Sequence, residues 1–213
     1  MAISINGSTN VITGLSQGGL PDGCVTNADI DGMAASKLTG ALPAISGANL
    51  TGITGGLSEV DEWRFNSSFA RSSTADITAN WERADTIFDK IGTGMSESSG
   101  IFTFPSSGIW LIDMQINTFS QSGLSSWIEL SMAYSTDSGS NFTNDTLYSY
   151  DHVEYQIGYY IYNTQQAQGI IDVQNASTWR VKFRCGAGNN QLNFTGSSTY
   201  KSNNFRFLKL GDT

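Results

Sequence analysis

Residues Gly14–Gly18 match the Gly-x-Ser-x-Gly pattern that carries the nucleophile of many hydrolases. That serine works on a sharp turn between a buried strand and a helix, next to a histidine. The segment around Ser16 is rich in glycine and predicts neither element. The single histidine, His152, lies beside Asp151 in a distant part of the chain where the pattern predicts strands. The motif therefore does not predict a hydrolase, and we expect no catalytic residues and no enzymatic activity.

Ligands for a metal ion are sparse. Residues 136–145 offer oxygen ligands, including Asp137 and Asp145, but they lack the acidic density of a calcium loop and fit a solvated hairpin tip better. One histidine and two distant cysteines, Cys24 and Cys185, do not have the spacing of a zinc or iron site. We predict no metal and no cofactor. We also expect two free thiols rather than a disulfide, because stapled secreted scaffolds use more cysteines in shorter chains.

Two groups of side chains are candidates for binding a ligand or a partner. Arg180, Lys182 and Arg184 alternate along one segment, so they share one strand face and could bind a phosphate or an acidic glycan. The alternative is a solvated strand face. Tyr160 and Tyr162 have the parity opposite to the apolar residues before them, so a second chain or a receptor could cover them. We expect the interface between chains.

The overall composition excludes several classes of protein. Charged residues make up 14% of the 213 residues, with 23 glycines and many Ser, Thr and Asn. This composition favours short strands and turns over long helices. The formal net charge of −8 argues against binding to nucleic acid. No apolar run approaches the roughly 18 residues of a membrane span, and the first residues do not resemble a signal peptide. We expect a protein made in a cytoplasm, without membrane insertion.

The chain divides by composition into two parts. Residues 1–57 contain no aromatic residue, whereas aromatic residues occur from Trp63 onward. The first part repeats Leu-Thr-Gly and similar triplets, and its isolated aliphatic residues offer too little apolar surface to close a core within one chain. We predict an assembly segment that orders against copies of itself or a partner, that is, an anchor or stalk. The alternative is a flexible linker.

The second part, residues 58–213, alternates apolar and polar residues with a period of two. The clearest alternations, each predicting a half-buried strand, are residues 110–116, 128–134, 153–161 and 179–185. Turn signals rich in Gly, Ser and Asn separate them. Seven or more strands without a long helix predict an all-β sandwich or jelly roll.

The final strand, residues 204–210, is apolar on both faces. Phe205 and Phe207 share one parity and Leu208 and Leu210 share the other. In a two-layer sandwich the opposite sheet covers one face, so a second chain is expected to cover the other. These four residues, with Tyr160 and Tyr162, are the predicted interface between chains. A loop folded over the strand would explain the same pattern.

A resemblance to a known family rests on residues 88–91 and 100–112. Phe88-Asp89 before a loop, then Gly100, Phe102 and Thr103, a proline-glycine corner and an aromatic strand resemble the globular head of the complement q subunit. The final strand is similar too. That family shares its trimeric jelly roll with tumour necrosis factor, so the resemblance implies a trimeric jelly roll over residues 60–213. The chain departs from the family at Trp110, where tyrosine is usual, and in lacking a collagen repeat.

Residues 1–57 resemble the repetitive N-terminal parts of bacteriophage tail and head fibre proteins, which commonly carry such a tip. The two resemblances together imply a virion structural protein of a tailed phage. Its partners would be itself, as a homotrimer, other virion proteins through residues 1–57, and a host surface glycan or protein at the tip. The alternative is a capsid decoration or fibre protein that only stabilises the shell.

Overall fold

A computed structural model describes residues 56–120, 127–143, 145–152, 160–188 and 191–213, and the backbone of residues 4–6 and 11–13. The chain divides into two units, Met1–Ile53 and Thr54–Thr213. In the first unit, β1 (Ser4–Asn6) and β2 (Val11–Thr13) pair antiparallel. The Gly14–Gly18 motif, Cys24 and the repeats lie outside the described residues, so the anchor or stalk remains a prediction.

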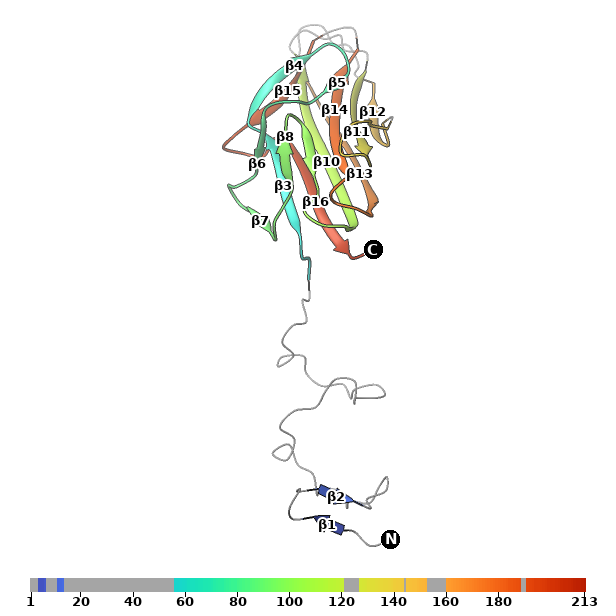
Figure 1. Cartoon of the computed structure of the whole chain (residues 1–213). Coiled ribbons are helices and arrows are strands. Elements are labelled where there is room, and N and C mark those ends of the chain that lie inside the picture. The colour runs from blue at the N-terminus through green and yellow to red at the C-terminus, as the bar shows by residue number, and fades with distance from the viewer. Residues whose placement is uncertain are drawn as a thin grey trace. The chain divides into compact units, whose positions relative to one another are not determined.

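An eight-stranded antiparallel sheet forms one layer of the second unit (Figure 1). Its longest strands, β10 and β13, pair along their full length from Gly108 opposite Val173 to Ser120 opposite Ile161. On its other edge β10 pairs with β16 and, near its end, with β15. The strands are β3 (Val60–Phe65), β4 (Ser67–Arg71), β6 (Trp81–Arg83), β7 (Lys90–Ile91), β10 (Gly108–Ser120), β13 (Ile161–Val173), β15 (Leu192–Ser197) and β16 (Asn204–Gly211).

A six-stranded antiparallel sheet forms the second layer. Its centre is β14, which pairs with β11 on one edge and with β9 and β5 on the other. The strands are β5 (Ala75–Asp76), β8 (Ser96–Ser98), β9 (Ile101–Thr103), β11 (Ile128–Ser135), β12 (Leu147–Asp151) and β14 (Arg180–Ala187). The described residues contain no helix, and the predicted all-β jelly roll is confirmed.

The core lies between the two sheets and follows the predicted alternation. On β10, the residues from Trp110 to Ile116 at every second position are at most 1% exposed. On β14, Val181, Phe183 and Cys185 are fully buried in the same cluster. Aromatic rings join the layers, for instance with 4.8 Å between the centroids of Phe183 and Phe205. The period of two visible in the sequence therefore identifies the inward face of both strands.

The final strand, β16, corrects part of the predicted interface between chains. Phe205 and Phe207 are fully buried within the core of their own chain, where both pack against Phe183. They are therefore not accessible to a second chain. Leu208 is half-buried and lies on the opposite face of the strand, opposite Leu111 of β10. Leu210 is 47% exposed and lies where the pairing of β16 with β10 shifts register. Both leucines remain accessible to a partner.

The strand predicted over residues 153–161 falls largely outside the described residues. Ile161 begins β13, and His152 lies exposed just after the end of β12 rather than within a strand. The sequence did not predict β13 itself, because polar residues occupy both of its faces between Asn163 and Gln168. Its pairing along all 13 positions of β10 determines its conformation.

The turn before β9 explains one glycine of the motif that resembles the complement q head. Gly100 has a φ of +83°, and a Cβ built there would lie 2.1 Å from the carbonyl oxygen of Ile77. Only glycine fits both the left-handed backbone and the close approach. Its amide donates a 2.6 Å hydrogen bond to Oε1 of Glu97, which closes the turn.

Candidate functional site

The outer face of the eight-stranded sheet, opposite the core, is the surface that carries the candidate site. The outward side chains of β10 change in chemistry along the strand, from apolar through polar and charged to polar and aromatic. In chain order they are Ile109, Leu111, Asp113, Gln115, Asn117 and Phe119. Neighbouring strands continue each of these groups sideways, so the outer face has three distinct zones.

The first zone is an apolar belt formed by Val60, Leu208, Leu111 and Ile170. Val60 and Leu111 each pair with Leu208, and Leu111 also pairs with Ile170, so the four residues lie side by side across β3, β16, β10 and β13. Ile170 is 64% exposed, and the other three are half-buried. An apolar row across four strands is the kind of surface that a partner covers. Only Leu208 of these four was expected at an interface from the sequence.

The second zone is a band of ion pairs next to the belt. Arg206 on β16 contacts Asp113 of β10 at 3.0 Å and Glu62 of β3 at 3.4 Å. Lys201 also binds Glu62. The amide of Gln166 on β13 donates a 3.2 Å hydrogen bond to Asp113. Because Glu62 and Asp113 are less than 10% exposed, these contacts compensate their charges within the chain.

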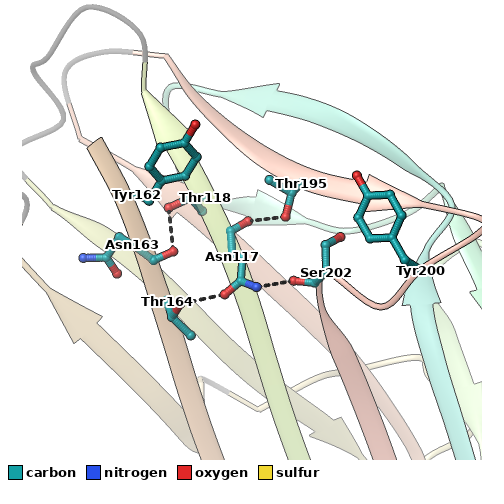
Figure 2. A pocket seen from close by; sticks show the side chains of 8 residues that line it. All are labelled: Asn117, Thr118, Tyr162, Asn163, Thr164, Thr195, Tyr200 and Ser202. Atoms are coloured by element: carbon teal, nitrogen blue, oxygen red, sulfur yellow. Dashed lines mark hydrogen bonds between the residues drawn. The ribbon is translucent and has the colours of Figure 1, made fainter. Parts of the chain in front are cut away.

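The third zone is a polar pocket of about 360 Å³ at the far end of β10. We call it the tyrosine pocket. Figure 2 shows Tyr162 and Tyr200 on opposite sides of Asn117. The pocket is lined by Asn117, Thr118, Tyr162, Asn163, Thr164, Thr195, Tyr200 and Ser202. None of these side chains carries a charge.

Hydrogen bonds fix the floor of the tyrosine pocket. Oδ1 of Asn117 accepts a hydrogen bond of 2.7 Å from the Thr164 hydroxyl, and its Nδ2 donates to the carbonyl oxygen of Ser202. The Thr195 hydroxyl donates to the Asn117 carbonyl at 3.0 Å. These bonds, drawn in Figure 2, join β10, β13, β15 and the end of the loop that leads into β16. The amide of Asn117 is therefore held in one orientation.

The two tyrosines of the pocket are among the most exposed aromatic residues of the described chain. Tyr162 is 73% exposed and Tyr200 is 64% exposed. Tyr160, which stacks near Tyr162 at 6.4 Å between ring centroids, is 56% exposed. Both Tyr160 and Tyr162 are thus exposed in the single chain, and their predicted place in an interface between chains stays a prediction. The sequence did not predict Tyr200 or Asn117, because the pairing of β10 with β13 and β15 and a loop contact bring them to the pocket.

The basic row Arg180, Lys182 and Arg184 does lie on the outward face of β14, but its cations are engaged within the chain. Arg184 forms ion pairs with Asp76 at 3.2 Å and Asp145 at 2.7 Å, and Lys182 binds Asp76 at 2.9 Å. The guanidinium of Arg180 donates to three backbone carbonyls between residues 176 and 179. This corrects the expectation of an anion-binding row, because carboxylates of the same chain pair Lys182 and Arg184 and the N–H groups of Arg180 bind backbone carbonyls.

The loop 136–145 uses its best oxygen ligand to close its own turn. The carboxylate of Asp137 accepts hydrogen bonds from the Ser135 hydroxyl and from the backbone and side-chain nitrogens of Asn141, at 2.6 to 2.9 Å. These bonds, with that from Ser135 first, lower the pKa of Asp137 to about 2. The arrangement is that of a hairpin tip stabilised by an Asx-type contact, as the sequence indicated.

Asp151 and His152 do not form a catalytic pair. The carboxylate of Asp151 accepts hydrogen bonds from the Asn163 side chain and from the backbone N–H of His152, and both lower its pKa. Cys185 is a buried free thiol whose pKa burial raises to about 12. A thiol in that state is a poor nucleophile. Ser16 of the hydrolase-like motif lies outside the described residues.

The described residues contain no cluster of three or more His, Cys, Asp or Glu side chains arranged to hold a metal ion. They also contain no helix long and apolar enough to cross a membrane.

The two antiparallel sheets form a jelly-roll fold similar to that of solved tumour necrosis factor proteins. No family model and no curated protein matches the chain by sequence. The structure of Eiger TNF from S. frugiperda superposes with a TM-score of 0.55 at 13% identity. The match covers 72% of this chain and 93% of that one.

Murine APRIL, in a crystal structure at pH 5.0, superposes with a TM-score of 0.50 at 11% identity. The match covers 71% of this chain and 98% of that chain. At these identities the likeness shows the shared fold and nothing about activity or partners. The expected jelly roll common to the complement q head and tumour necrosis factor is confirmed at the level of fold.

Proposed function

We propose that the chain is a virion structural protein of a tailed phage, a tail or head fibre whose residues 58–213 form a trimeric tip for attachment to the host surface. Residues 1–57 anchor it to other virion proteins. The observation that carries the proposal is the apolar belt, because it leaves the folded chain with an apolar surface suited to a further copy.

The belt and the ion-pair band together favour association of identical chains. Covering Ile170 and its neighbours in a partner removes apolar surface from water at about 25 cal/mol per Å². Closed rotational symmetry allows the same patch on each of three chains to be covered. The charges of Glu62 and Asp113 are already compensated within the chain by Lys201 and Arg206. Bringing three chains together therefore need not bury an unpaired charge.

The phage assignment derives from the combination of the two parts. A repetitive segment without aromatic residues precedes a jelly roll, and the segment resembles the N-terminal parts of phage fibres. The polar, acidic exterior, with a net charge of −8, fits a particle that must stay soluble. Three weak sites on one trimer gain avidity, which suits attachment to a repetitive cell surface.

The second candidate is a capsid decoration or fibre protein with a purely structural, shell-stabilising role. The internal pairing of Arg180, Lys182 and Arg184 favours it, since that row was the expected contact for an acidic receptor. In this role the tip would serve as a mechanical clamp between shell subunits.

Light scattering on the full chain and on a fragment of residues 58–213 tests the assembly. We expect both at three times their chain mass, the full chain being 22.9 kDa. A monomeric fragment overturns the trimeric tip and leaves residues 1–57 as the assembly determinant. Binding of the fluorescently labelled full chain to a panel of bacterial strains tests attachment. Saturable binding to a strain supports attachment, and binding to none favours the shell-stabilising role.

A further inference from the structure

We infer that the tyrosine pocket binds a neutral saccharide, with Tyr162 and Tyr200 stacking on sugar rings and Asn117 at its floor bonding sugar hydroxyls. The inference rests on the proposed attachment function and gives it a site and a ligand class. Neither the basic row nor the apolar belt contributes to this site.

The chemistry of the lining selects an uncharged ligand. The side chains of the pocket are hydroxyls, amides and phenols, which both donate and accept hydrogen bonds, as sugar hydroxyls do. A cationic side chain, the usual partner of phosphate, sulfate or uronate groups, is absent among the lining residues. The net charge of −8 further disfavours an anionic ligand.

The two exposed tyrosine rings supply the apolar contacts that a sugar needs. With 73% of Tyr162 and 64% of Tyr200 exposed, much of both side chains is accessible to a ligand in the pocket. An aromatic ring offers a large, rigid contact area at low entropic cost, while its hydroxyl stays available for hydrogen bonds. Two rings on either side of a polar floor (Figure 2) match a ligand with apolar C–H faces and a polar rim.

The floor of the pocket is arranged before a ligand arrives. Asn117 uses one lone pair of Oδ1 for Thr164 and one proton of Nδ2 for Ser202. The second lone pair and the second proton of the same amide remain for a ligand. Because the amide is already held, binding loses little side-chain entropy. The volume of about 360 Å³ lies at the small end of the roughly 300–1,000 Å³ of ligand pockets.

The pocket stays accessible when the belt is covered. Leu111 of the belt and Asn117 of the pocket lie on the same strand, six positions apart, about 20 Å at ~3.3 Å per residue. A trimer that buries the belt therefore leaves three pockets at one end of the assembly. Three weak sites on one particle increase the avidity for a repeating polysaccharide.

Saturation-transfer difference NMR on the full chain tests the inference. The probes are maltotriose, chitotriose and galactobiose, with trigalacturonate as the anionic comparison, each at millimolar concentration. We expect saturation of ring C–H protons in at least one neutral probe and none in trigalacturonate. The Tyr162→Ala/Tyr200→Ala variant should weaken that binding about tenfold, as expected for two lost ring contacts. The Tyr162→Phe/Tyr200→Phe variant keeps the rings and should retain most of it.

Tyr148→Ala/Tyr150→Ala is the matched control, because these tyrosines of β12 are 52% and 53% exposed and stack on each other outside the pocket. The control should bind as the unmodified chain does. The inference is overturned if no neutral probe binds. It is also overturned if the pocket variant binds the probe as well as the unmodified chain does, or if only the control variant loses binding. Attachment to cells that persists in the pocket variant removes this site and leaves the attachment function standing.

Discussion

Replacing Ile170 by aspartate should dissociate the trimer while leaving each chain folded. The side chain is 64% exposed at the end of the apolar belt, opposite Leu111. In the single chain it is mostly in water, so a carboxylate is tolerated there. In the proposed trimer it is covered, so the same carboxylate loses its hydration without a partner.

The size of the effect follows from the exposed fraction of Ile170. Full burial of such a side chain stabilises by about 1.5–3 kcal/mol. Since 64% of the residue remains to be covered, the interface gains about 1–2 kcal/mol per chain. Three chains lose about 3–6 kcal/mol together, a weakening of assembly by about 10²- to 10⁴-fold before any desolvation of aspartate is added.

Sedimentation at a series of protein concentrations measures this change, with circular dichroism as the check on folding. Ile87→Asp is the matched control, because Ile87 is 85% exposed and lies in the loop between β6 and β7, away from the belt. We expect Ile87→Asp to remain trimeric where Ile170→Asp is monomeric. If Ile170→Asp forms a trimer with unchanged affinity between chains, the belt is not the interface. If Ile170→Asp and Ile87→Asp dissociate equally, the effect is not specific to the belt.

Three further predictions concern the fold that holds the site. Asp61→Ala should lower the free energy of unfolding by about 3–5 kcal/mol in a chemical denaturation, because the buried carboxylate pairs with Arg83 and accepts hydrogen bonds from the buried N–H groups of Trp63 and Met95, which would lose their acceptor. Gly100→Ala should lower the free energy of unfolding in urea by about 2–4 kcal/mol, because the backbone is left-handed there and the new Cβ would clash with the carbonyl of Ile77. The control Gly211→Ala has open space around the new Cβ and should change the same free energy by less than ~0.5 kcal/mol. Burial raises the pKa of Cys185 to about 12. The folded state therefore favours the neutral thiol, and the stabilisation that this gives below pH 9 should be lost as the pH rises toward 12. Unfolding measured over this pH range should not show that loss in Cys185→Ala.

Periodicity in the sequence predicts those strands whose two faces differ in polarity. The inward residues of β14, and those of β10 from Ile112 to Ile116, alternate with polar ones, so their core face could be predicted directly. The residues of β13 between Asn163 and Gln168 are polar on both faces. Their strand conformation comes from pairing with β10, a contact over more than 40 positions of sequence. A single-sequence pattern carries no signal for such a strand.

The sequence predicted only part of the candidate site, again because contacts between distant segments leave no pattern in a single sequence. Parity shows which way a side chain points but not what it meets. It placed Arg184 outward correctly, yet Asp76 and Asp145, which neutralise it, come from distant segments. It placed Tyr162 on an open surface, but the pairing of β10 with β13 and β15 and a loop contact bring Asn117 and Tyr200 beside it. The tertiary contacts, and not the strand pattern, decide which exposed residue is free to bind.

The length of β10 explains how one sheet face can serve assembly and recognition together. Thirteen residues extend over about 40 Å at ~3.3 Å per residue, longer than one contact zone requires. Leu111 at one end continues into an apolar row, and Asn117 near the other continues into a polar pocket. Asp113 lies between them and is compensated by Arg206. This ion pair separates the apolar belt, whose burial in a partner is favourable, from the tyrosine pocket, whose polar lining is open to solvent and ligand. Substitutions at the two ends should therefore affect assembly and saccharide binding independently, as expected for positions this far apart without shared contacts.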